Sequence, residues 1–341
     1  MCIRDSGNLG ETFDITVGTR QGCNLSPSLF NLYINDIPSL LDKGKCNPVD
    51  LYNAKINCLV YADDMLVLSK SKKGLSKALI ILEIYCKKCR LKINANKTKI
   101  MIFNKHKYED CNFQIDGREL ENVQTYNYLG IKVSSSGSFI TAIKELTNKA
   151  KRAYFAMKSS FIDSKISPKL FMKMYDILVK PITLYGCEIW GAFGHKMQPI
   201  ENLCKMIYRN DKFPYEQLHL KACKASIGVS KHTNNFGIRS ELGRLPLIFN
   251  IFVAICKYRI RLNSFKQNDL LYHAFQSQHK LNYNSYKSMT YSSFTDKLKH
   301  CLGIKCPNVQ ATSTQTSWDS QTNHIKNKCR QYTTLISFMN N

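Results

Sequence analysis

The chain has 341 residues, and 49 Lys and Arg residues against 25 Asp and Glu residues give a net charge of +24. This charge is not typical of a compact acidic enzyme of small-molecule metabolism. Hydrophobic residues at 44% are enough for a buried core, and 22% charged residues are too few for a disordered polyelectrolyte. The charge is +6 over residues 1–110 (17 against 11) and +18 over residues 111–341 (32 against 14). Because basic surfaces attract phosphate backbones, we expect a nucleic acid partner in preference to an anionic membrane or a merely solubilising charge.

Neither a membrane span nor a secretory signal is expected. The longest apolar stretch, residues 245–256, is shorter than the roughly 20 residues that cross a bilayer, so it predicts a buried helix. The first fifteen residues hold three acidic residues and no apolar core of a signal peptide. Fourteen scattered cysteines then indicate an intracellular protein with reduced thiols.

The first clear element in chain order is a turn that enters a helix, between Thr16 and Asp36. Ser26 is predicted as the N-cap and Pro27 as the first helical residue, because apolar residues then recur at helical spacing as far as Ile37.

A hairpin and a helix follow. Residues 55–69 are two apolar β-type runs interrupted by Asp63 and Asp64, which predicts a β-hairpin with acid at its tip. Apolar residues then recur in steps of four and three from Leu75, which predicts an amphipathic helix that ends near residue 90.

Two further strands are expected at residues 99–103 and 128–133, so the pattern predicts an α+β fold. From Ile140 the helical period takes over, with an apolar side and a basic side. The basic side consists of Lys144, Lys149, Lys151, Arg152 and Lys158.

The rest of the chain, from residue 167 onward, is predicted to form helices followed by a polar tail. Ser167 and Pro168 should begin a helix that Pro181 ends, and residues 196–265 continue in helical patterns. Breaks in those patterns are expected at Pro214, Gly228, Gly237 and Pro246. Residues 277–341 are polar with weak periodicity, so we expect a loosely ordered tail.

Asp63 and Asp64 are the most conspicuous chemical feature. Two adjacent carboxylates repel each other unless a cation offsets them, and their oxygens suit Mg²⁺. The alternative is ordinary turn chemistry, since aspartate favours turns. The flanking apolar strands favour a functional site.

Four motifs occur in the order found in reverse transcriptases of non-LTR retrotransposons. Tyr61-Ala-Asp-Asp64 resembles the catalytic hairpin of that family, and the block from Arg20 to Asp36 resembles the segment before it. Residues 91–103 resemble the segment after the hairpin, and residues 126–132 resemble the primer-grip strand. Residues 184–190 and 240–246 resemble the helical region that follows the thumb in these elements, the jockey-like group included.

The resemblance implies RNA-directed DNA synthesis by two-metal nucleotidyl transfer, with Mg²⁺ or Mn²⁺ as cofactor. RNA template, DNA primer or target DNA, and dNTPs would be the partners, in the nucleus and in a cytoplasmic ribonucleoprotein. Asp63 would be the principal metal ligand and Asp64 the weaker one, and Lys97 would protonate the leaving pyrophosphate, with Lys92 and Lys99 as alternatives. The implied substrate and template–primer contacts are Arg20, Gln21, Gly22, Tyr61, Leu129, Gly130, Lys144, Lys151 and Arg152.

The implied fold is α+β: a partial right-hand polymerase palm with an antiparallel sheet, an α-helical thumb and a helical extension. The expected domains are a non-native or disordered start (1–11), the partial palm (12–134), the thumb (135–195), the basic helical extension (196–276) and the polar tail (277–341).

Family polymerases carry another catalytic aspartate well before the Arg-Gln-Gly block. Asp5, Glu11 and Asp14 are the acidic residues before Arg20, and none stands in such a context. We therefore read the chain as a C-terminal fragment that alone polymerises little or nothing, because one carboxylate of the site is missing.

The cysteines do not predict a zinc site. Cys86 and Cys89 lie on the apolar stripe of a helix, where free cysteine packs as a small hydrophobe. The spacing of Cys301, Cys306, His324 and Cys329 is too loose for a zinc knuckle, so zinc is not expected.

Two other functions fit parts of the sequence. One is a non-enzymatic nucleic-acid-binding remnant of a decayed element, although the intact Asp63-Asp64 pair favours a functional parent. The other is an RNA-templated RNA polymerase, against which Tyr61-Ala62 and the Arg-Gln-Gly block favour reverse transcription.

Overall fold

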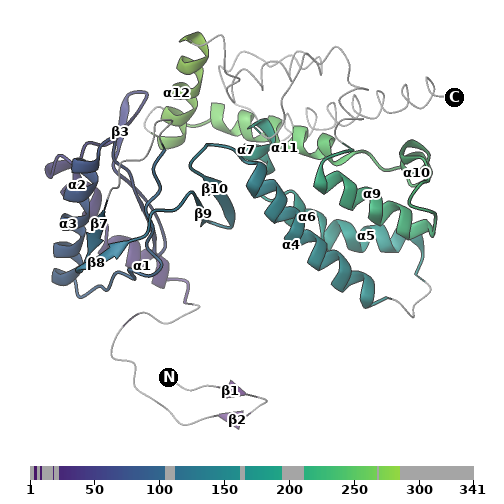
Figure 1. Cartoon of the computed structure of the whole chain (residues 1–341), viewed down its shortest axis with the longest axis horizontal. Helices are drawn as coiled ribbons and strands as arrows, with labels where there is room; N and C mark the ends of the chain where they lie inside the picture. Colours follow the sequence, from purple (N-terminus) through teal and green to yellow (C-terminus); the bar gives the residue numbers. More distant parts are fainter. Residues whose placement is uncertain are drawn as a thin grey trace. The chain divides into compact units, whose positions relative to one another are not determined.

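The computed structural model describes residues 4–5, 8–9, 18, 23–103, 112–161, 166–193, 211–266 and 269–284. The chain divides into two compact units, Met1–Thr98 with Asp110–Glu121, and Lys99–Glu109 with Asn122–Asn341. Within the described residues, helices occur together with small antiparallel strand pairs, which confirms the α+β class (Figure 1). Within the described residues the strands pair only in twos, so the single antiparallel sheet expected for the palm is not formed there.

The described residues of the first unit form three helices and four strand pairs. Its helices are α1 (Ser26–Tyr33), α2 (Ile37–Lys43) and α3 (Lys72–Lys88). Its strand pairs are β1 (Arg4–Asp5) with β2 (Asn8–Leu9), β3 (Val49–Leu51) with β4 (Ala54–Ile56), β5 (Cys58–Tyr61) with β6 (Asp64–Val67), and β7 (Phe113–Ile115) with β8 (Arg118–Leu120).

The first predicted helix is divided in two. It begins at Ser26 and its N-cap is Leu25, one residue before the predicted N-cap Ser26. It ends at Tyr33, and α2 follows with Pro38 in its first turn. Proline lacks an N–H and its ring clashes with the carbonyl of the fourth residue before it, so one continuous helix through Ile37 was not possible.

Helix α3 forms the centre of the first unit. Its N-cap Ser71 accepts a hydrogen bond from the N–H of Gly74, 3.1 Å away, which satisfies one free donor of the first turn. Its buried face includes Leu82 and Tyr85, which pack against Ile37 and other residues of α2 and the hairpins. The predicted amphipathic helix is confirmed.

The described residues of the second unit are mostly helical, with one hairpin among them. Its elements are β9 (Thr125–Tyr128), β10 (Ile131–Ser134), α4 (Ile140–Ser159), α5 (Pro168–Leu178), α6 (Lys180–Thr183), α7 (Cys187–Phe193), α9 (Pro214–Ile227), α10 (Asn235–Glu241), α11 (Leu247–Asn263) and α12 (Leu270–Asn284).

Several helix predictions are confirmed. Helix α4 buries residues such as Ala150 and Tyr154, and α11 is the buried helix expected from its apolar sequence. Ser167 caps α5 by accepting from the N–H of Leu170 at 3.3 Å. Helix α5 ends at Leu178, while Pro181 stands in the first turn of α6, where proline is tolerated.

Other predictions were wrong. Residues 99–103 are not a strand, because Ile100 makes only an isolated bridge with Asn122 and no adjacent segment pairs with its neighbours. Residues 128–133 are not one strand either, because a turn divides β9 from β10. Gly237 lies inside α10, since the Asn234 side chain caps that helix and one glycine costs it only about 1 kcal/mol.

At the two ends of the expected domain scheme, which stays a prediction, residues 4–5 pair with residues 8–9 as β1 and β2, and α12 extends past residue 276 to Asn284. The rest of the predicted tail lies outside the described residues. Among described helices, none is long and apolar enough to cross a membrane.

Candidate active site

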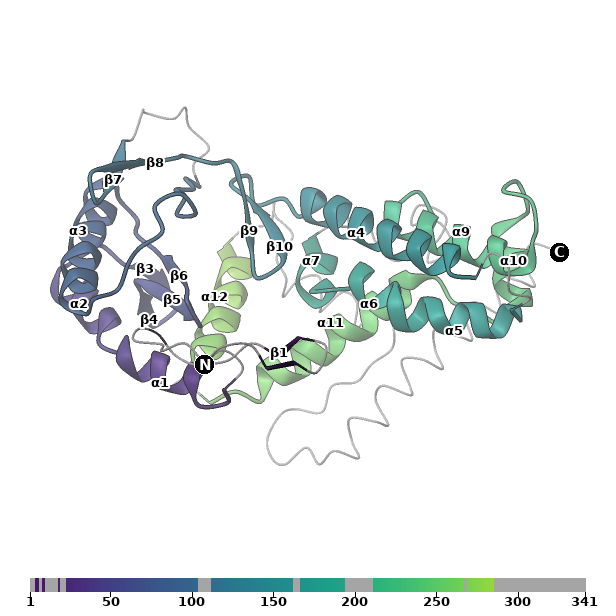
Figure 2. The same cartoon turned by 90° about the horizontal axis from the view of Figure 1, so that it is seen from below.

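The acidic hairpin predicted from the sequence is formed by β5 and β6 (Figure 2). Tyr61 pairs with Asp64 across the hairpin, so Ala62 and Asp63 are the two central residues of its turn. Asp63 is therefore in the turn and Asp64 is the first residue of β6. Both carboxylates and the Tyr61 side chain are exposed.

The turn is held in an unfavourable backbone conformation. Ala62 has φ of 52°, in the left-handed region that residues with a Cβ seldom adopt. Such strain costs of order 1 kcal/mol and is characteristic of functional sites, where surrounding structure maintains it. The conformation places two adjacent carboxylates at the exposed tip of the hairpin.

The carboxylates suit a divalent cation in their chemistry, because hard oxygen ligands are those that Mg²⁺ takes. Within the described residues no ion pair or hydrogen bond neutralises either of them, and no group of three or more His, Cys, Asp or Glu side chains could hold a metal. Asp63 and Asp64 thus remain two adjacent, exposed carboxylates of the chemical type that could supply part of a ligand set.

The base of the hairpin is anchored by Asn57, which sequence reasoning missed. Its side-chain nitrogen donates to the carbonyl of Pro38 at 2.9 Å and to Oδ1 of Asp42 at 2.6 Å. Its own carbonyl accepts from the N–H of Leu68 at 2.7 Å. Asn57 is only 5% exposed, so a buried amide fixes the hairpin to α2. The one sequence signal was a polar residue directly before an apolar strand.

Two tyrosines connect α1 to α3. The hydroxyl of Tyr85 donates to Oδ1 of Asp36 at 2.6 Å and to the carbonyl of Tyr33 at 2.9 Å. In return, the hydroxyl of Tyr33 donates to the carbonyl of Cys89 at 2.6 Å. Burial and the hydrogen bond to Asp36 raise the pKa of Tyr85, so it stays a protonated donor. Cys86 and Cys89 are half-buried against this core, in agreement with their expected packing role.

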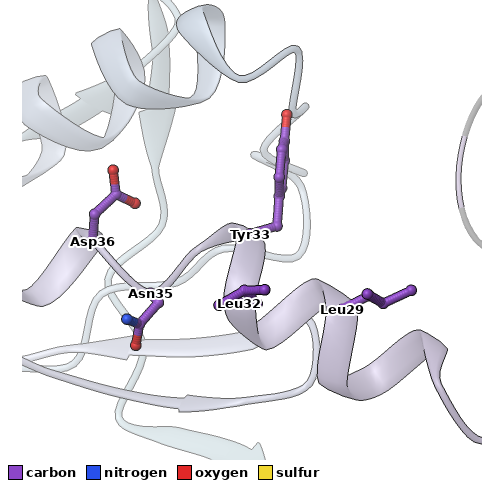
Figure 3. Close-up of a pocket in the computed structure, with 5 residues that line it drawn as sticks. All are labelled: Leu29, Leu32, Tyr33, Asn35 and Asp36. Carbon is purple, nitrogen blue, oxygen red and sulfur yellow. The ribbon is translucent and has the colours of Figure 1, made fainter.

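An open pocket of about 440 Å³ lies on α1. Figure 3 shows Leu29, Leu32 and Tyr33 on the helix and Asn35 and Asp36 on the connection to α2. Leu32 is 73% exposed, so the pocket is largely an uncovered apolar surface. Arg20, Gln21 and Gly22, which precede α1 in sequence, lie outside the described residues.

Lys97 lies in a turn after α3, with its side chain exposed. Its N–H donates to the carbonyl of Asn94 at 3.1 Å and to the Asn94 side-chain oxygen at 3.2 Å. Lys97 therefore occupies a turn stabilised by an asparagine, not the end of a strand. Like the acidic turn, it belongs to the first unit.

Leu129 and Gly130 belong to the second unit, where they form the two-residue turn between β9 and β10. Both residues have positive φ, 47° for Leu129 and 81° for Gly130. Positive φ at both positions is typical of a type I′ hairpin turn, in which asparagine is usual at the first position.

The expected basic surface is formed on α4. Lys144, Lys151 and Arg152 are exposed, opposite the buried face of the helix. Lys149 is partly engaged, because Glu145 accepts from it at 3.4 Å and from Lys132 at 3.3 Å. The Cys and His residues considered as zinc ligands in the tail lie outside the described residues.

Comparisons with known proteins show a matching family and several similar proteins. Residues 2–133 match the family described as reverse transcriptase (RNA-dependent DNA polymerase). Over 187 residues the chain is 27% identical to the RNA-directed DNA polymerase from mobile element jockey of Drosophila melanogaster, covering 52% of this chain and 20% of that protein. Over 245 residues it is 28% identical to the "Probable RNA-directed DNA polymerase from transposon BS" of Drosophila melanogaster. This match covers 65% of this chain and 26% of that protein.

The chain thus spans about a fifth to a quarter of the length of these curated relatives. The segment matched by the family contains the acidic β5–β6 turn and the Leu129-Gly130 turn. On these grounds residues 2–133 are similar to reverse transcriptases, and the chain is similar to part of the RNA-directed DNA polymerases of jockey and related mobile elements.

Proposed function

We propose that this chain supplies part of the palm and the thumb of an RNA-directed DNA polymerase, which extends a DNA primer on an RNA template with dNTPs. The observation that carries the proposal is the exposed Asp63-Asp64 turn, strained at Ala62 and anchored at its base by Asn57. A rigidly supported turn presents its carboxylates in one geometry, which nucleotidyl transfer requires.

Asp63 and Asp64 would hold Mg²⁺ or Mn²⁺ together with ligands from elsewhere in the polymerase. When bound, the ion lowers the pKa of the primer 3′ hydroxyl and offsets the charge of the triphosphate. Lys97 would give a proton to the departing pyrophosphate oxygen. Tyr61, which is 63% exposed beside the turn, would contact the nascent base pair together with Arg20, Gln21 and Gly22.

The second unit would hold the template–primer duplex. Leu129 and Gly130 would support the primer terminus, and Lys144, Lys151 and Arg152 would contact phosphates. The charge balance of α4 and α9 supports this role, because these helices contain one acidic residue each. Glu145 is paired with lysines, and Glu216 is fully buried.

The domain scheme remains part of the proposal: a partial palm over 12–134, a thumb over 135–195 and a basic extension over 196–276. The parent polymerase would act in the nucleus and in a cytoplasmic ribonucleoprotein. This chain alone is expected to bind template–primer and to polymerise little or nothing.

The test is the affinity of the purified chain for a fluorescent RNA/DNA hybrid, measured by anisotropy with and without Mg²⁺. The double variant Asp63→Asn/Asp64→Asn should lose the Mg²⁺-dependent part of the affinity. The matched control is Asp116→Asn/Glu119→Gln, which removes two carboxylates at the β7–β8 turn and should keep that part.

Equal affinity with and without Mg²⁺, in the original chain and both variants, would contradict the polymerase proposal. It would instead favour a remnant that binds nucleic acid through its charge alone.

A further inference from the structure

A tyrosine far along the chain contacts the turn between β9 and β10. The hydroxyl of Tyr185, in the connection between α6 and α7, donates to the carbonyl of Leu129 at 3.0 Å. The ring of Tyr185 also lies against Gly130, where an added Cβ would be 3.3 Å from ring atom Cε1. One side chain therefore contacts both residues of the turn, and all three residues belong to the second unit.

The turn needs such support because of its first residue. Leu129 adopts φ of 47°, where asparagine or glycine would be comfortable and leucine is not. Leu129 is also 37% exposed, so burial of its side chain does not hold it there. A hydrogen bond to its carbonyl opposes rotation of the peptide group that joins it to Gly130.

Tyr185 is itself fixed to the core of the second unit. Its carbonyl accepts from the indole nitrogen of Trp190 at 2.8 Å, and Trp190 is completely buried. The next residue, Gly186, has φ of 66°, and a Cβ there would come within 2.5 Å of Cδ1 of Ile131 in β10. The segment from Tyr185 to Trp190 thus packs directly on the hairpin.

The hydrogen bond from the Tyr185 hydroxyl to the turn is not explained by packing alone. Tyr185 is 50% exposed, so its hydrogen bond competes with water and adds little to the stability of the fold. In the same unit Tyr154 and Tyr175 bury hydroxyls that have no partner within the described residues. The Tyr185 hydroxyl, in contrast, is directed at the backbone of the strained turn.

We propose that Tyr185 is a positioning residue that holds the Leu129-Gly130 turn in the conformation that receives the primer terminus. The inference rests on the function proposed for that turn. A turn already fixed in the free protein loses less conformational entropy on binding, so the preference for a primer end depends on the hydroxyl.

The test uses the full chain and two RNA/DNA hybrids of equal length, each with 2-aminopurine in the DNA strand. In one hybrid the probe is the last base of a recessed 3′ end, and in the other it lies inside a continuous duplex. Tyr185→Phe should weaken binding of the recessed end about fivefold and reduce its fluorescence change, while binding of the continuous duplex is unchanged. Tyr175→Phe, which removes a hydroxyl without a described partner, is the matched control and should keep the preference.

Thermal unfolding separates positioning from folding, since Tyr185→Phe should melt within a few degrees of the original chain. The inference is overturned if Tyr185→Phe keeps the preference for the recessed end, or if it weakens both hybrids equally. If the original chain binds neither hybrid, both the inference and the proposed function fail. If the original chain binds both hybrids without preference, only the inference about Tyr185 fails.

Discussion

Arg244 and Asp176 form a two-pronged ion pair across 68 residues of sequence, with guanidinium nitrogens 2.7 and 2.6 Å from the two carboxylate oxygens. Asp176 lies on α5, and Arg244 lies between α10 and α11. Although burial would raise the pKa of Asp176, the hydrogen bonds from Arg244 lower it below its usual value. The pair therefore fixes the connection before α11 to α5.

Replacing Arg244 by lysine should destabilise the second unit by about 1–2 kcal/mol, because an ammonium group cannot make both hydrogen bonds. Urea unfolding followed by tryptophan fluorescence measures this loss. Arg152→Lys, at an exposed position of α4, is the control and should change stability by less than about 0.5 kcal/mol. If the Arg244→Lys variant has the same free energy of unfolding as the original chain, the pair is only a surface contact that does not stabilise the fold.

Gly74 permits the close approach of α3 to the segment before β3. A Cβ there would lie 2.4 Å from the Ser69 hydroxyl and 2.5 Å from the Cys46 carbonyl, which are hydrogen-bonded to each other at 2.8 Å. Gly74→Ala should therefore cost about 1–3 kcal/mol and speed hydrogen exchange in α3. Gly237→Ala, also helical but with open space around it, should instead stabilise by about 0.5–1 kcal/mol. Equal effects of the two variants would refute the packing argument.

A buried charge network in the second unit should make stability depend on pH. His219 on α9 lies 3.1 Å from Glu216, which also accepts from Arg239 on α10 at 2.9 Å, while Tyr175 of α5 stacks on the imidazole. Burial alone would lower the pKa of His219, but hydrogen bonds to Cys223 and Glu216 raise it to about 9.

Because the folded pKa of His219 exceeds its unfolded value, its stabilising contribution is complete below about pH 6.5 and is lost as the pH rises through about 9. Between these values the free energy of unfolding should fall by up to about 1.4 kcal/mol per pH unit from this group. His219→Gln should remove that part of the slope, whatever its effect on absolute stability. Parallel pH profiles for the two proteins would show that His219 is neutral in the folded state.

Local elements were predictable from the sequence because neighbouring residues determine them. Helix α4 follows from its apolar and basic periodicity, and the β5–β6 hairpin follows from two apolar runs around Asp63 and Asp64. The division of the first helix could also have been predicted, since Pro38 excludes its continuation.

The rest depends on residues distant in sequence. The sequence places Leu129 in an apolar strand, whereas its left-handed conformation is supported by a contact with Tyr185, 56 residues later. Likewise, Asn57 becomes an anchor only because α2 presents a carbonyl and a carboxylate to it. The chemical group at the acidic turn was therefore predictable, whereas its structural support was not.

The basic face of α4 should contribute counterion release to nucleic acid binding. Lys144→Gln/Lys151→Gln should reduce the slope of log affinity against log salt by roughly 2, because each phosphate contact contributes about 0.9. Lys169→Gln/Lys173→Gln removes the same charge from exposed positions of α5 and should change the slope by less than about 0.5. Equal slopes for the two double variants would mean that the chain binds nucleic acid through its total charge and not through the basic face of α4.

The most direct measurement of the central claim is cleavage of the chain by Fe²⁺ bound in place of Mg²⁺. With an RNA/DNA hybrid, dNTP, ascorbate and peroxide present, hydroxyl radicals cut the backbone close to the ion. The account predicts cuts near the Ala62-Asp63 turn that excess Mg²⁺ suppresses and Asp63→Asn abolishes. Cuts that persist unchanged in Asp63→Asn, or no cuts near that turn, would contradict the assignment of Asp63 and Asp64 as metal ligands.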